Sequence, residues 1–410
     1  RRGAIIALLS DDIALSVLAF LDVHVLWLML QVNKRFMRLA SEDMLWHALL
    51  ADELGESNLP SQLSTPGGWR KRFWQWHRLD ACGYDVEQQP QPMAEAPKAR
   101  FLHRAACLAG RWLYVFGGQG QHGEFDDLWV LDKDRALHDD AWTHVQTHEP
   151  GPEQRQSATL TAVGQVLLMF GGRQGESRFM NDTWLFDTTT CSWRCVSSSD
   201  DNWLPQQNST GTKPCPRWAH SAVQFDNRVL VFGGSAPGRC FGDLHWFDMD
   251  TLRWSAQEPT ASKAPSERSG HCACAVGNSM YIFGGNTTKA SFNDLWDYDV
   301  PSCEWRLVKT HGRSPSGRVG HTITAVGSRL LVLGGREYTT NSFDSSLHSF
   351  NVRTKVWSQV PLDTYLPGSE RPPVRTGHCT TVHAGRLLLF GGLRDDGHFL
   401  DDITAVTFMR

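Results

Sequence analysis

The chain has 410 residues, of which 41% are hydrophobic and 20% are charged. It can therefore bury a sizeable core and is not disordered as a whole. The net charge is −4, from 40 lysines and arginines against 44 aspartates and glutamates. This balance gives no positive field that would attract nucleic acid or anionic lipid, so we expect neither nucleic acid nor a membrane as a partner. The first residue is Arg1 rather than methionine, and we expect flanking sequence beyond it.

The ten cysteines are spread from Cys82 to Cys379, and none forms a C-x-x-C pair. Reduced, buried thiols are the simplest interpretation of this scatter. Because disulfides are rare in the cytosol and nucleus, the cysteine pattern favours a cytoplasmic or nuclear protein.

The N-terminal segment, residues 8–50, carries apolar side chains at helical intervals, beginning with Ile13, Val17 and Leu21. Residues 13–30 are strongly apolar, but Asp22 lies in the middle of this run. An aspartate is costly inside a bilayer, which favours helices of a soluble protein over a membrane span. So short a segment cannot bury all of its apolar faces alone, and it therefore needs a partner surface.

The rest of the chain is organised by a repeat. Six short apolar runs end in paired glycines, at steps of 50 to 62 residues: LYVFGG, LLMFGG, VLVFGG, MYIFGG, LLVLGG and LLLFGG. Each run predicts a buried strand closed by a turn, where glycine permits a positive φ or a close backbone approach.

Other residues recur at fixed distances from these glycines. An arginine lies 16 residues before the first glycine in repeats two to six, and a histidine lies 13 residues before it in repeats three to six. In repeat one Phe101 and Arg104 fall at these places, and in repeat two Ala158 replaces the histidine. An aromatic–aspartate element such as FDDLWVLD follows the glycines, and a lone tryptophan follows it in repeats one to five. Because these residues recur at one register, we interpret them as scaffold rather than as catalytic groups.

This combination of strand, glycine pair, strand and tryptophan resembles the kelch family. The resemblance implies a mainly β fold, in which six units of four antiparallel strands pack radially as a six-bladed β-propeller. We assign residues 69–410 to the propeller and residues 1–68 to a small helical domain.

Repeat six has no tryptophan strand, whereas Trp76 precedes repeat one at a matching spacing. We therefore predict that a strand around Trp76 closes the last blade and removes an exposed sheet edge. Residues 80–100 are expected to form a connecting loop.

The core of the N-terminal domain, residues 8–50, resembles an F-box, with an acidic turn, an apolar "L..FL" pattern and a final "L..D..LW". Ser10 and Asn33 depart from the proline and cysteine of the family pattern. In that family the α-helical F-box binds a Skp-type adaptor. The resemblance implies an adaptor-binding surface formed by Leu9, Ile13, Val17, Leu21, Val32, Phe36 and Trp46. The alternative is a helical cap on the propeller.

Target recognition is expected where the repeats differ. In a four-strand meander, the loop entering the first strand and the loop after the glycines lie on one face. Trp, Tyr and Arg commonly anchor protein interfaces. The candidate target-binding residues in these loops are His122, Arg173, Trp203, Trp218, Arg239, Arg336, Tyr338 and Arg394. The alternative is that Glu176, Glu337 and Asp395 neutralise the arginines.

F-box followed by kelch repeats is also the domain order of part of the plant LOV/F-box/kelch photoreceptors, although nothing here resembles a flavin-binding LOV domain. The resemblance implies a substrate-recognition subunit of an SCF-type ubiquitin ligase. Its F-box would bind the Skp-type adaptor and, through it, a cullin. Its propeller would bind a protein substrate, and the arginines of the candidate loops favour an acidic or phosphorylated segment. The alternative is a kelch scaffold or signalling protein without a ligase role.

A propeller metalloenzyme is a third class. We find no cluster of metal ligands that breaks the repeat, no phosphate loop and no nucleophile elbow. We therefore expect no metal, no cofactor and no enzymatic activity.

Overall fold

The computed structural model describes residues 43–55, 58–59, 68–77, 85–88, 95–138, 141–147, 150–199, 213–258, 263–287, 289–360 and 373–407. Within these ranges there are two α-helices, α5 (Asp43–Leu54) and α6 (Gly68–His77). Neither of them is long and apolar enough to cross a membrane.

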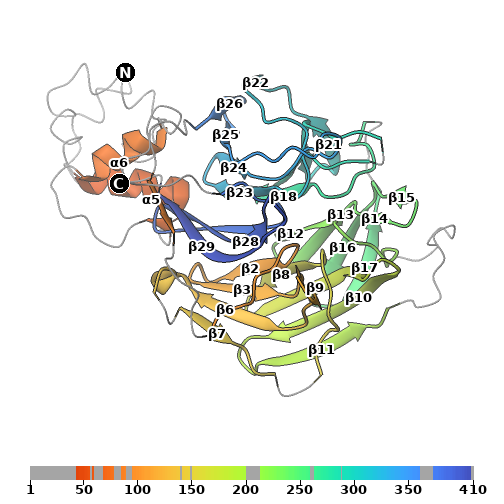
Figure 1. Ribbon diagram of the computed structural model, residues 1–410. Coiled ribbons are helices and arrows are strands. Elements are labelled where there is room, and N and C mark those ends of the chain that lie inside the picture. Colours follow the sequence, from red (N-terminus) through yellow and green to blue (C-terminus); the bar gives the residue numbers. More distant parts are fainter. Residues whose placement is uncertain are drawn as a thin grey trace, which may run out of the picture.

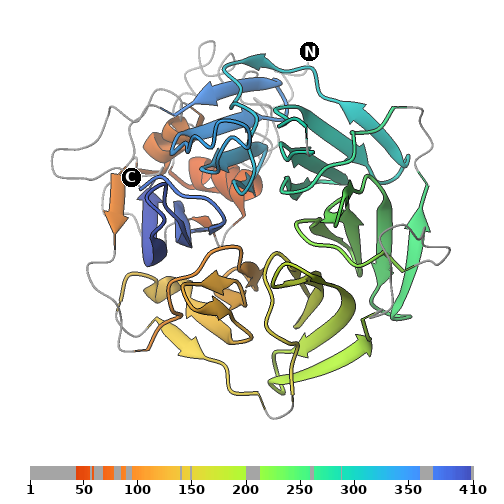
Figure 2. The same ribbon diagram turned by 45° about the vertical axis from the view of Figure 1, so that its right-hand side comes forward.

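Six sheets, each built around a meander of four antiparallel strands, stand around one axis as the blades of a propeller (Figure 2). Blade 1 is formed by β2 (Arg104–Leu108), β3 (Trp112–Phe116), β6 (Leu128–Asp132) and β7 (Trp142–His144). Blade 2 is formed by β8 (Thr159–Val163), β9 (Val166–Gln174), β10 (Arg178–Asp187) and β11 (Ser192–Ser197). Blade 3 is formed by β12 (Ser221–Phe225), β13 (Arg228–Phe232), β16 (Leu244–Asp248) and β17 (Arg253–Gln257). Blade 4 is formed by β18 (Cys272–Val276), β19 (Ser279–Phe283), β20 (Leu295–Asp299) and β21 (Glu304–Leu307). Blade 5 is formed by β23 (Thr322–Val326), β24 (Arg329–Leu333), β25 (Leu347–Asn351) and β26 (Val356–Gln359). Blade 6 is formed by β27 (Cys379–His383), β28 (Arg386–Leu393), β29 (Phe399–Thr407) and β1 (Asp85–Gln88). The mainly β, six-bladed propeller predicted from the repeat is confirmed.

The chain also contains short strands and one 3-10 turn in addition to the six meanders. Two-stranded ribbons are formed by β4 (Gln119–Gly120) with β5 (Gly123–Glu124) and by β14 (Ser235–Ala236) with β15 (Arg239–Cys240). Strand β22 (His311–Gly312) adds a fifth, parallel strand to blade 5 beside β26. A single turn of 3-10 helix, η2 (Lys133–Arg135), follows β6.

The lone tryptophans hold neighbouring blades together. Each packs on the phenylalanine that precedes the glycine pair of the blade before it, with ring centroids 4.6 to 5.6 Å apart. The pairs are Trp142–Phe390, Trp193–Phe116, Trp254–Phe170, Trp305–Phe232 and Trp357–Phe283. Blade 6 contributes no such tryptophan, and the facing position in blade 5 is Leu333, a smaller side chain. The interface between blades 5 and 6 thus lacks both the tryptophan and the phenylalanine that pack together at the other five interfaces.

The ring is closed by β1, which pairs antiparallel with β29 at the outer edge of blade 6 (Figure 2). The prediction that the segment around Trp76 makes this strand is wrong, because Trp76 lies in α6. The stretch expected to be only a loop, residues 80–100, contains the closing strand instead. In α6 Phe73 and Trp76 are three residues apart, so they share one helix face, and both are buried.

Repeat one is offset from the other repeats by one residue. The turn between β2 and β3 has three residues, Ala109–Arg111, where the matching turns in the other blades have two. The residues equivalent to the recurring arginine and histidine are therefore Arg100 and His103, rather than Phe101 and Arg104 as predicted from a fixed spacing. The inserted turn residue is the physical reason for the error.

The two helices pack on each other and on the propeller, beside blades 5 and 6 (Figure 1). Glu53 of α5 accepts hydrogen bonds from Trp76 Nε1 at 3.2 Å and from Ser328 Oγ at 3.1 Å. Gly385 N donates to the carbonyl of Asn58 at 2.6 Å. Ser328 and Gly385 lie in the turns between the first and second strands of blades 5 and 6. These turns are at the opposite ends of the strands from the glycine pairs, so the helices dock on the face away from the variable loops.

Breaking the β1–β29 pairing should lower stability. Only alternate residues of an antiparallel strand bond to a given partner, so replacing both Val86 and Glu87 by proline removes at least one bonded N–H. We expect the double variant to lose about 3 kcal/mol or more of unfolding free energy, measured by urea denaturation. The control is the double alanine variant, which keeps both N–H groups. Equal losses in the two variants would show that backbone pairing by β1 does not close the ring.

Candidate functional site

The site is built on a buried arginine in each blade. The six framework arginines are at most 2% exposed, and each donates from Nη1 to the carbonyl of the first glycine of its own pair at 2.9 to 3.0 Å. Each also pairs with the aspartate that follows the glycine loop. The pairs are Arg100–Asp127, Arg155–Asp182, Arg217–Asp243, Arg268–Asp294, Arg318–Asp344 and Arg375–Asp402. All are bidentate except Arg318–Asp344, which has one contact at 2.8 Å.

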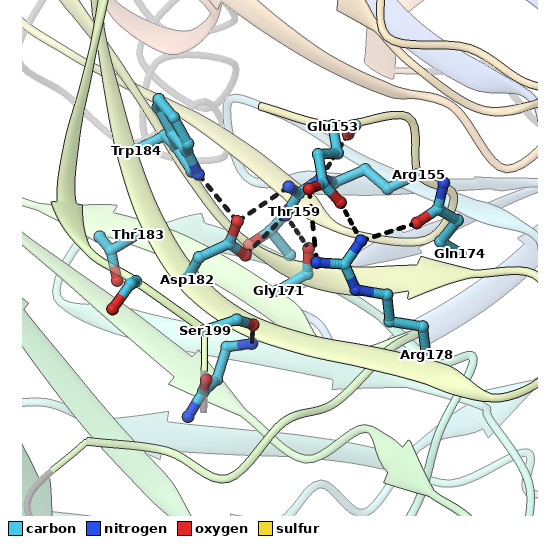
Figure 3. A network of polar contacts seen from close by, with 12 residues as sticks. Glu153, Arg155, Thr159, Gly171, Gln174, Arg178, Asp182, Thr183, Trp184 and Ser199 are labelled. Atoms are coloured by element: carbon cyan, nitrogen blue, oxygen red, sulfur yellow. Dashed lines mark hydrogen bonds and ion pairs between the residues drawn. The ribbon is translucent and has the colours of Figure 1, made fainter. Parts of the chain in front are cut away.

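Figure 3 shows this arrangement in blade 2, where Arg155 reaches Asp182 and the Gly171 carbonyl, while Trp184 Nε1 donates to the same aspartate at 2.8 Å. In blade 3, burial alone would raise the pKa of Asp243, but the charge and hydrogen bonds of Arg217 hold it well below its ordinary value. Each framework arginine is thus engaged both by a backbone carbonyl and by a carboxylate.

A layer of histidines lies next to the arginines. His103, His220, His271, His321 and His378 are 1 to 4% exposed. Burial, reinforced by the neighbouring framework arginines, lowers the pKa of each below its ordinary value, to about 3 for His321. These rings are therefore neutral at pH 7 and add no positive charge to the site.

A closed circle of six backbone hydrogen bonds surrounds the axis. Each donor N–H belongs to one blade and each acceptor carbonyl to the neighbouring blade, at 2.7 to 3.3 Å. We call these residues the collar: Leu102, Ser157, Ala219, Gly270, Gly320 and Gly377. All six have positive φ, including the three that are not glycine. The cost of holding Leu102, Ser157 and Ala219 in this region is offset because the complete ring fixes them.

The collar borders a central cavity of about 600 Å³ that receives lining residues from all six blades. This size is typical of ligand sites, and the lining combines apolar and cationic side chains. Five of the predicted target-binding residues line it: Arg173, Trp218, Arg239, Arg336 and Tyr338. These five residues come from loops of different blades that converge at one end of the axis, as the meander topology predicts.

Arg173, Arg239 and Arg336 form what we call the cationic rim of the cavity, and aromatic rings partly hold it in place. The Arg173 guanidinium lies 3.9 Å from the centre of the Trp218 ring, and Arg239 lies 4.7 Å from that of Phe241. Burial lowers the pKa of Arg173, with Glu124 and Glu176 opposing this shift. Arg336 Nη1 donates to Asn341 at 2.9 Å. Tyr338 is 47% exposed and can be covered by a partner.

Two of the remaining predicted target residues, His122 and Arg394, do not line the cavity. His122 lies in a separate hollow of about 590 Å³ between the glycine loops of blades 1 and 6, together with His398. Arg394 forms an ion pair with Asp396 at 3.0 Å, so an acidic neighbour does neutralise this arginine, although not the Asp395 that we named. Trp203 lies outside the described residues.

Six of the seven predicted adaptor-binding residues, Leu9, Ile13, Val17, Leu21, Val32 and Phe36, also lie outside the described residues. The seventh, Trp46, is 1% exposed in α5 and packs on Phe73 with ring centroids 4.9 Å apart. Its indole is used to join α5 to α6, so it is not available on the surface as a docking side chain.

Sequence reasoning missed Arg104 and Phe179 as lining residues. Arg104 was placed at the histidine register of repeat one, because the inserted turn residue was not recognised. Phe179 belongs to the aromatic–aspartate element and was assigned to scaffold. Within the described ranges there is no group of three or more His, Cys, Asp or Glu side chains that could hold a metal ion.

Comparison with known proteins places these features in context. The model of the family described as KLHDC2/KLHL20/DRC7 Kelch-repeats domain matches residues 67–209 and 195–392. Kelch domain-containing protein 3 of Bos taurus is 30% identical over 277 residues, which are 63% of this chain and 69% of that protein. Tip elongation aberrant protein 1 of Schizosaccharomyces pombe is 31% identical over 309 residues, or 73% and 25% of the two chains. Acyl-CoA-binding domain-containing protein 5 of Arabidopsis thaliana is 30% identical over 283 residues. The present chain spans 42% of that plant protein, less than half its length.

The histidine layer should make the propeller sensitive to acid. The pKa values of these histidines are lower in the folded chain than the value of about 6.5 in the unfolded chain, so the unfolded chain binds more protons as the pH falls. The contribution of these histidines to the unfolding free energy is therefore fully present above about pH 6.5, and it is lost as the pH falls toward their pKa values in the folded chain. The depressed carboxyl pKa values, such as that of Asp243, matter only below about pH 4.

Replacing His321 by alanine, the residue that blade 2 has at this position, should reduce the loss of unfolding free energy between pH 7 and pH 5 by about 1–2 kcal/mol. Urea denaturation at the two pH values measures this difference, and the exposed His311→Ala variant is the control. An unchanged pH dependence in His321→Ala would contradict the assignment of a buried neutral ring.

Proposed function

The chain belongs to the kelch-repeat family, and from this premise we propose that it is a protein-recognition subunit that binds a target protein at the central cavity and its rim. The observation that carries this proposal is the cavity of about 600 Å³, to which all six blades contribute. A pocket with a few cationic groups among apolar ones is typical of a recognition site. The stacked Arg173–Trp218 pair and the exposed Tyr338 provide the residue types that dominate binding energy at protein interfaces.

The chemistry of the rim favours an acidic or phosphorylated target segment. Arg173, Arg239 and Arg336 all line the cavity, and each can provide the paired N–H donors that suit carboxylate and phosphate groups. The adjacent histidines are neutral, so the positive charge of the cavity comes from arginine. We propose that the chain performs no chemistry of its own and needs no cofactor.

We further propose that the N-terminal segment is an F-box that binds a Skp-type adaptor, which would make the chain the substrate receptor of a cullin ubiquitin ligase. The "L..D..LW" match places Leu45 and Trp46 at the end of the F-box pattern, and this part of the chain is helical in α5. The helices dock on blades 5 and 6, opposite the cavity, so an adaptor and a target could bind at the same time. The described cysteines are free thiols, which supports action in the cytoplasm or nucleus.

A scaffold or signalling role without ubiquitination is the second candidate. It requires the same cavity but no adaptor, so adaptor binding separates the two functions. None of the three relatives named above has a name that mentions a ubiquitin ligase.

Replacing Val17 and Leu21 by aspartate should abolish co-purification of a Skp-type adaptor, because two charges would enter an apolar docking surface. The control is Val356→Asp, a partly exposed apolar position on blade 5. Circular dichroism melting checks that the propeller stays folded in each variant. Adaptor binding equal to that of the wild type in the Val17/Leu21 variant would leave the scaffold role as the better function.

Changing Arg173, Arg239 or Arg336 to glutamate, one at a time, should weaken capture of a target identified by affinity purification and mass spectrometry. We expect a loss of at least tenfold at low salt, because each change reverses a charge beside an anionic ligand, and a smaller loss at high salt. The matched control is Arg306→Glu on β21, whose side chain is 54% exposed and far from the cavity. Unchanged capture in all three cavity variants would place the target elsewhere on the propeller.

A further inference from the structure

Arg104 is the one charged residue among six equivalent positions at the start of the innermost strands. The residue that directly follows the histidine position begins the first strand of every blade. In the other five blades this residue is uncharged: Thr159, Ser221, Cys272, Thr322 and Cys379. The repeat therefore does not require an arginine here, and packing alone does not explain one.

The contacts of Arg104 differ from those of the framework arginines. Its Nε donates to the carbonyl of Ala158 at 2.7 Å, and its Nη1 makes a long contact of 3.4 Å with the carbonyl of His103. Among the residues that the structure describes, no carboxylate forms an ion pair with Arg104, whereas every framework arginine has one. Two backbone carbonyls thus accept hydrogen bonds from Nε and Nη1 of the guanidinium, whereas Nη2 bonds to no described residue.

The surroundings of Arg104 do not compensate its charge. Arg104 is partly exposed, and the space that it faces is the central cavity, which it lines together with His271, Cys272 and His378. These histidines are neutral. Burial lowers the pKa of Arg104, opposed by the nearby thiols of Cys272 and Cys379. A cation removed from water without a counterion is unfavourable, and an anion that enters the cavity would relieve this cost.

The other polar groups in this layer do not compete for such an anion. The hydroxyl groups of Thr159, Ser221 and Thr322 lie 3.1, 2.9 and 3.4 Å from Nε2 of a histidine in the following blade. They are already engaged between blades. Among the six equivalent positions at the start of the innermost strands, Arg104 consequently provides the strongest hydrogen-bond donor that faces the cavity.

We propose that Arg104 binds an oxyanion, a carboxylate or a phosphate group, carried by the peptide segment that the central cavity captures. This proposal rests on the proposed function and assigns a specificity-determining residue within the same cavity. The cavity volume of about 600 Å³ is large enough for a few residues of a partner. The anionic group would enter past the collar to Arg104, while Trp218 and Tyr338 would contact the flanking residues nearer the rim.

A first test needs no knowledge of the partner. The melting temperature of the full chain is measured in inorganic phosphate and in chloride at matched ionic strength, for the wild type, Arg104→Gln, Arg104→Met and the control Arg306→Gln. We expect phosphate to raise the melting temperature of the wild type and the control by about 2–4 °C, the size expected for a ligand at roughly ten times its Kd. Both Arg104 variants should lose this shift. They should also be at least as stable as the wild type in chloride, because a partly desolvated cation without a counterion has been removed.

A second test distinguishes the source of the oxyanion. Degenerate peptide libraries with a fixed central glutamate, phosphoserine or glutamine are bound to the full chain, with acetylated and amidated ends so that terminal charges do not contribute. We expect at least tenfold preference for glutamate or phosphoserine over glutamine in the wild type, and loss of this preference in Arg104→Gln. The preferred library identifies a carboxylate or a phosphate ligand.

An equal phosphate shift in the wild type and in both Arg104 variants overturns the assignment of Arg104, as does an unchanged anion preference in Arg104→Gln. Neither result affects the proposed function if the rim variants still lose target capture. Conversely, loss of the phosphate shift in the Arg104 variants with unchanged capture in all rim variants supports an anion site but removes the proposed target-binding role of the rim.

Discussion

The buried arginine–aspartate pair of each blade is the interaction on which the rest of the propeller depends. The arginine side chain joins its own first glycine to the aspartate beyond the loop. Its backbone carbonyl accepts the N–H of the second glycine of the preceding blade, as in Gly172 to Arg217 at 2.9 Å. Because the last of these bonds runs from Gly392 to Arg100 at 2.8 Å, the same residue type organises each blade and links the blades into a ring. Removing the aspartate leaves the buried arginine without its counterion, and loss of a partner by a buried charge typically costs about 3–5 kcal/mol.

This dependence explains which features could be predicted from sequence. An interaction that recurs from blade to blade leaves its residues at a nearly constant spacing, so the six glycine pairs, with arginines and tryptophans in register in five repeats, identified the propeller. A side chain used only once leaves no such pattern. The closing strand β1 has the sequence DVEQ, with no apolar run to mark it, whereas Trp76, which resembled the tryptophan of a fourth strand, lies in α6.

The candidate site could be predicted in part for the same reason. Meander topology brought five of eight candidate target residues to one cavity, since the topology fixes the end of the axis at which every glycine loop lies. It could not show that Arg394 pairs with Asp396, because contacts within a loop depend on its local conformation. It also could not place Arg104 correctly, since one additional residue in the turn at Ala109–Arg111 shifts every position before the turn when it is counted back from the glycines. An irregularity in the repeat thus misled sequence reasoning at a position that lines the cavity.

The collar separates the shape of the cavity entrance from its chemistry. Its six hydrogen bonds are made entirely by backbone atoms, from Leu102 through Gly320 to Gly377 and back. The aperture is therefore set by peptide groups, whereas the lining is set by side chains such as Arg104 and Trp218 that project around it. Substitutions of lining residues can alter what the cavity accepts without altering the frame that holds it open. Related propellers with the same collar can therefore diverge in ligand preference by one side chain at a time, because the backbone ring that sets the aperture is inherited unchanged.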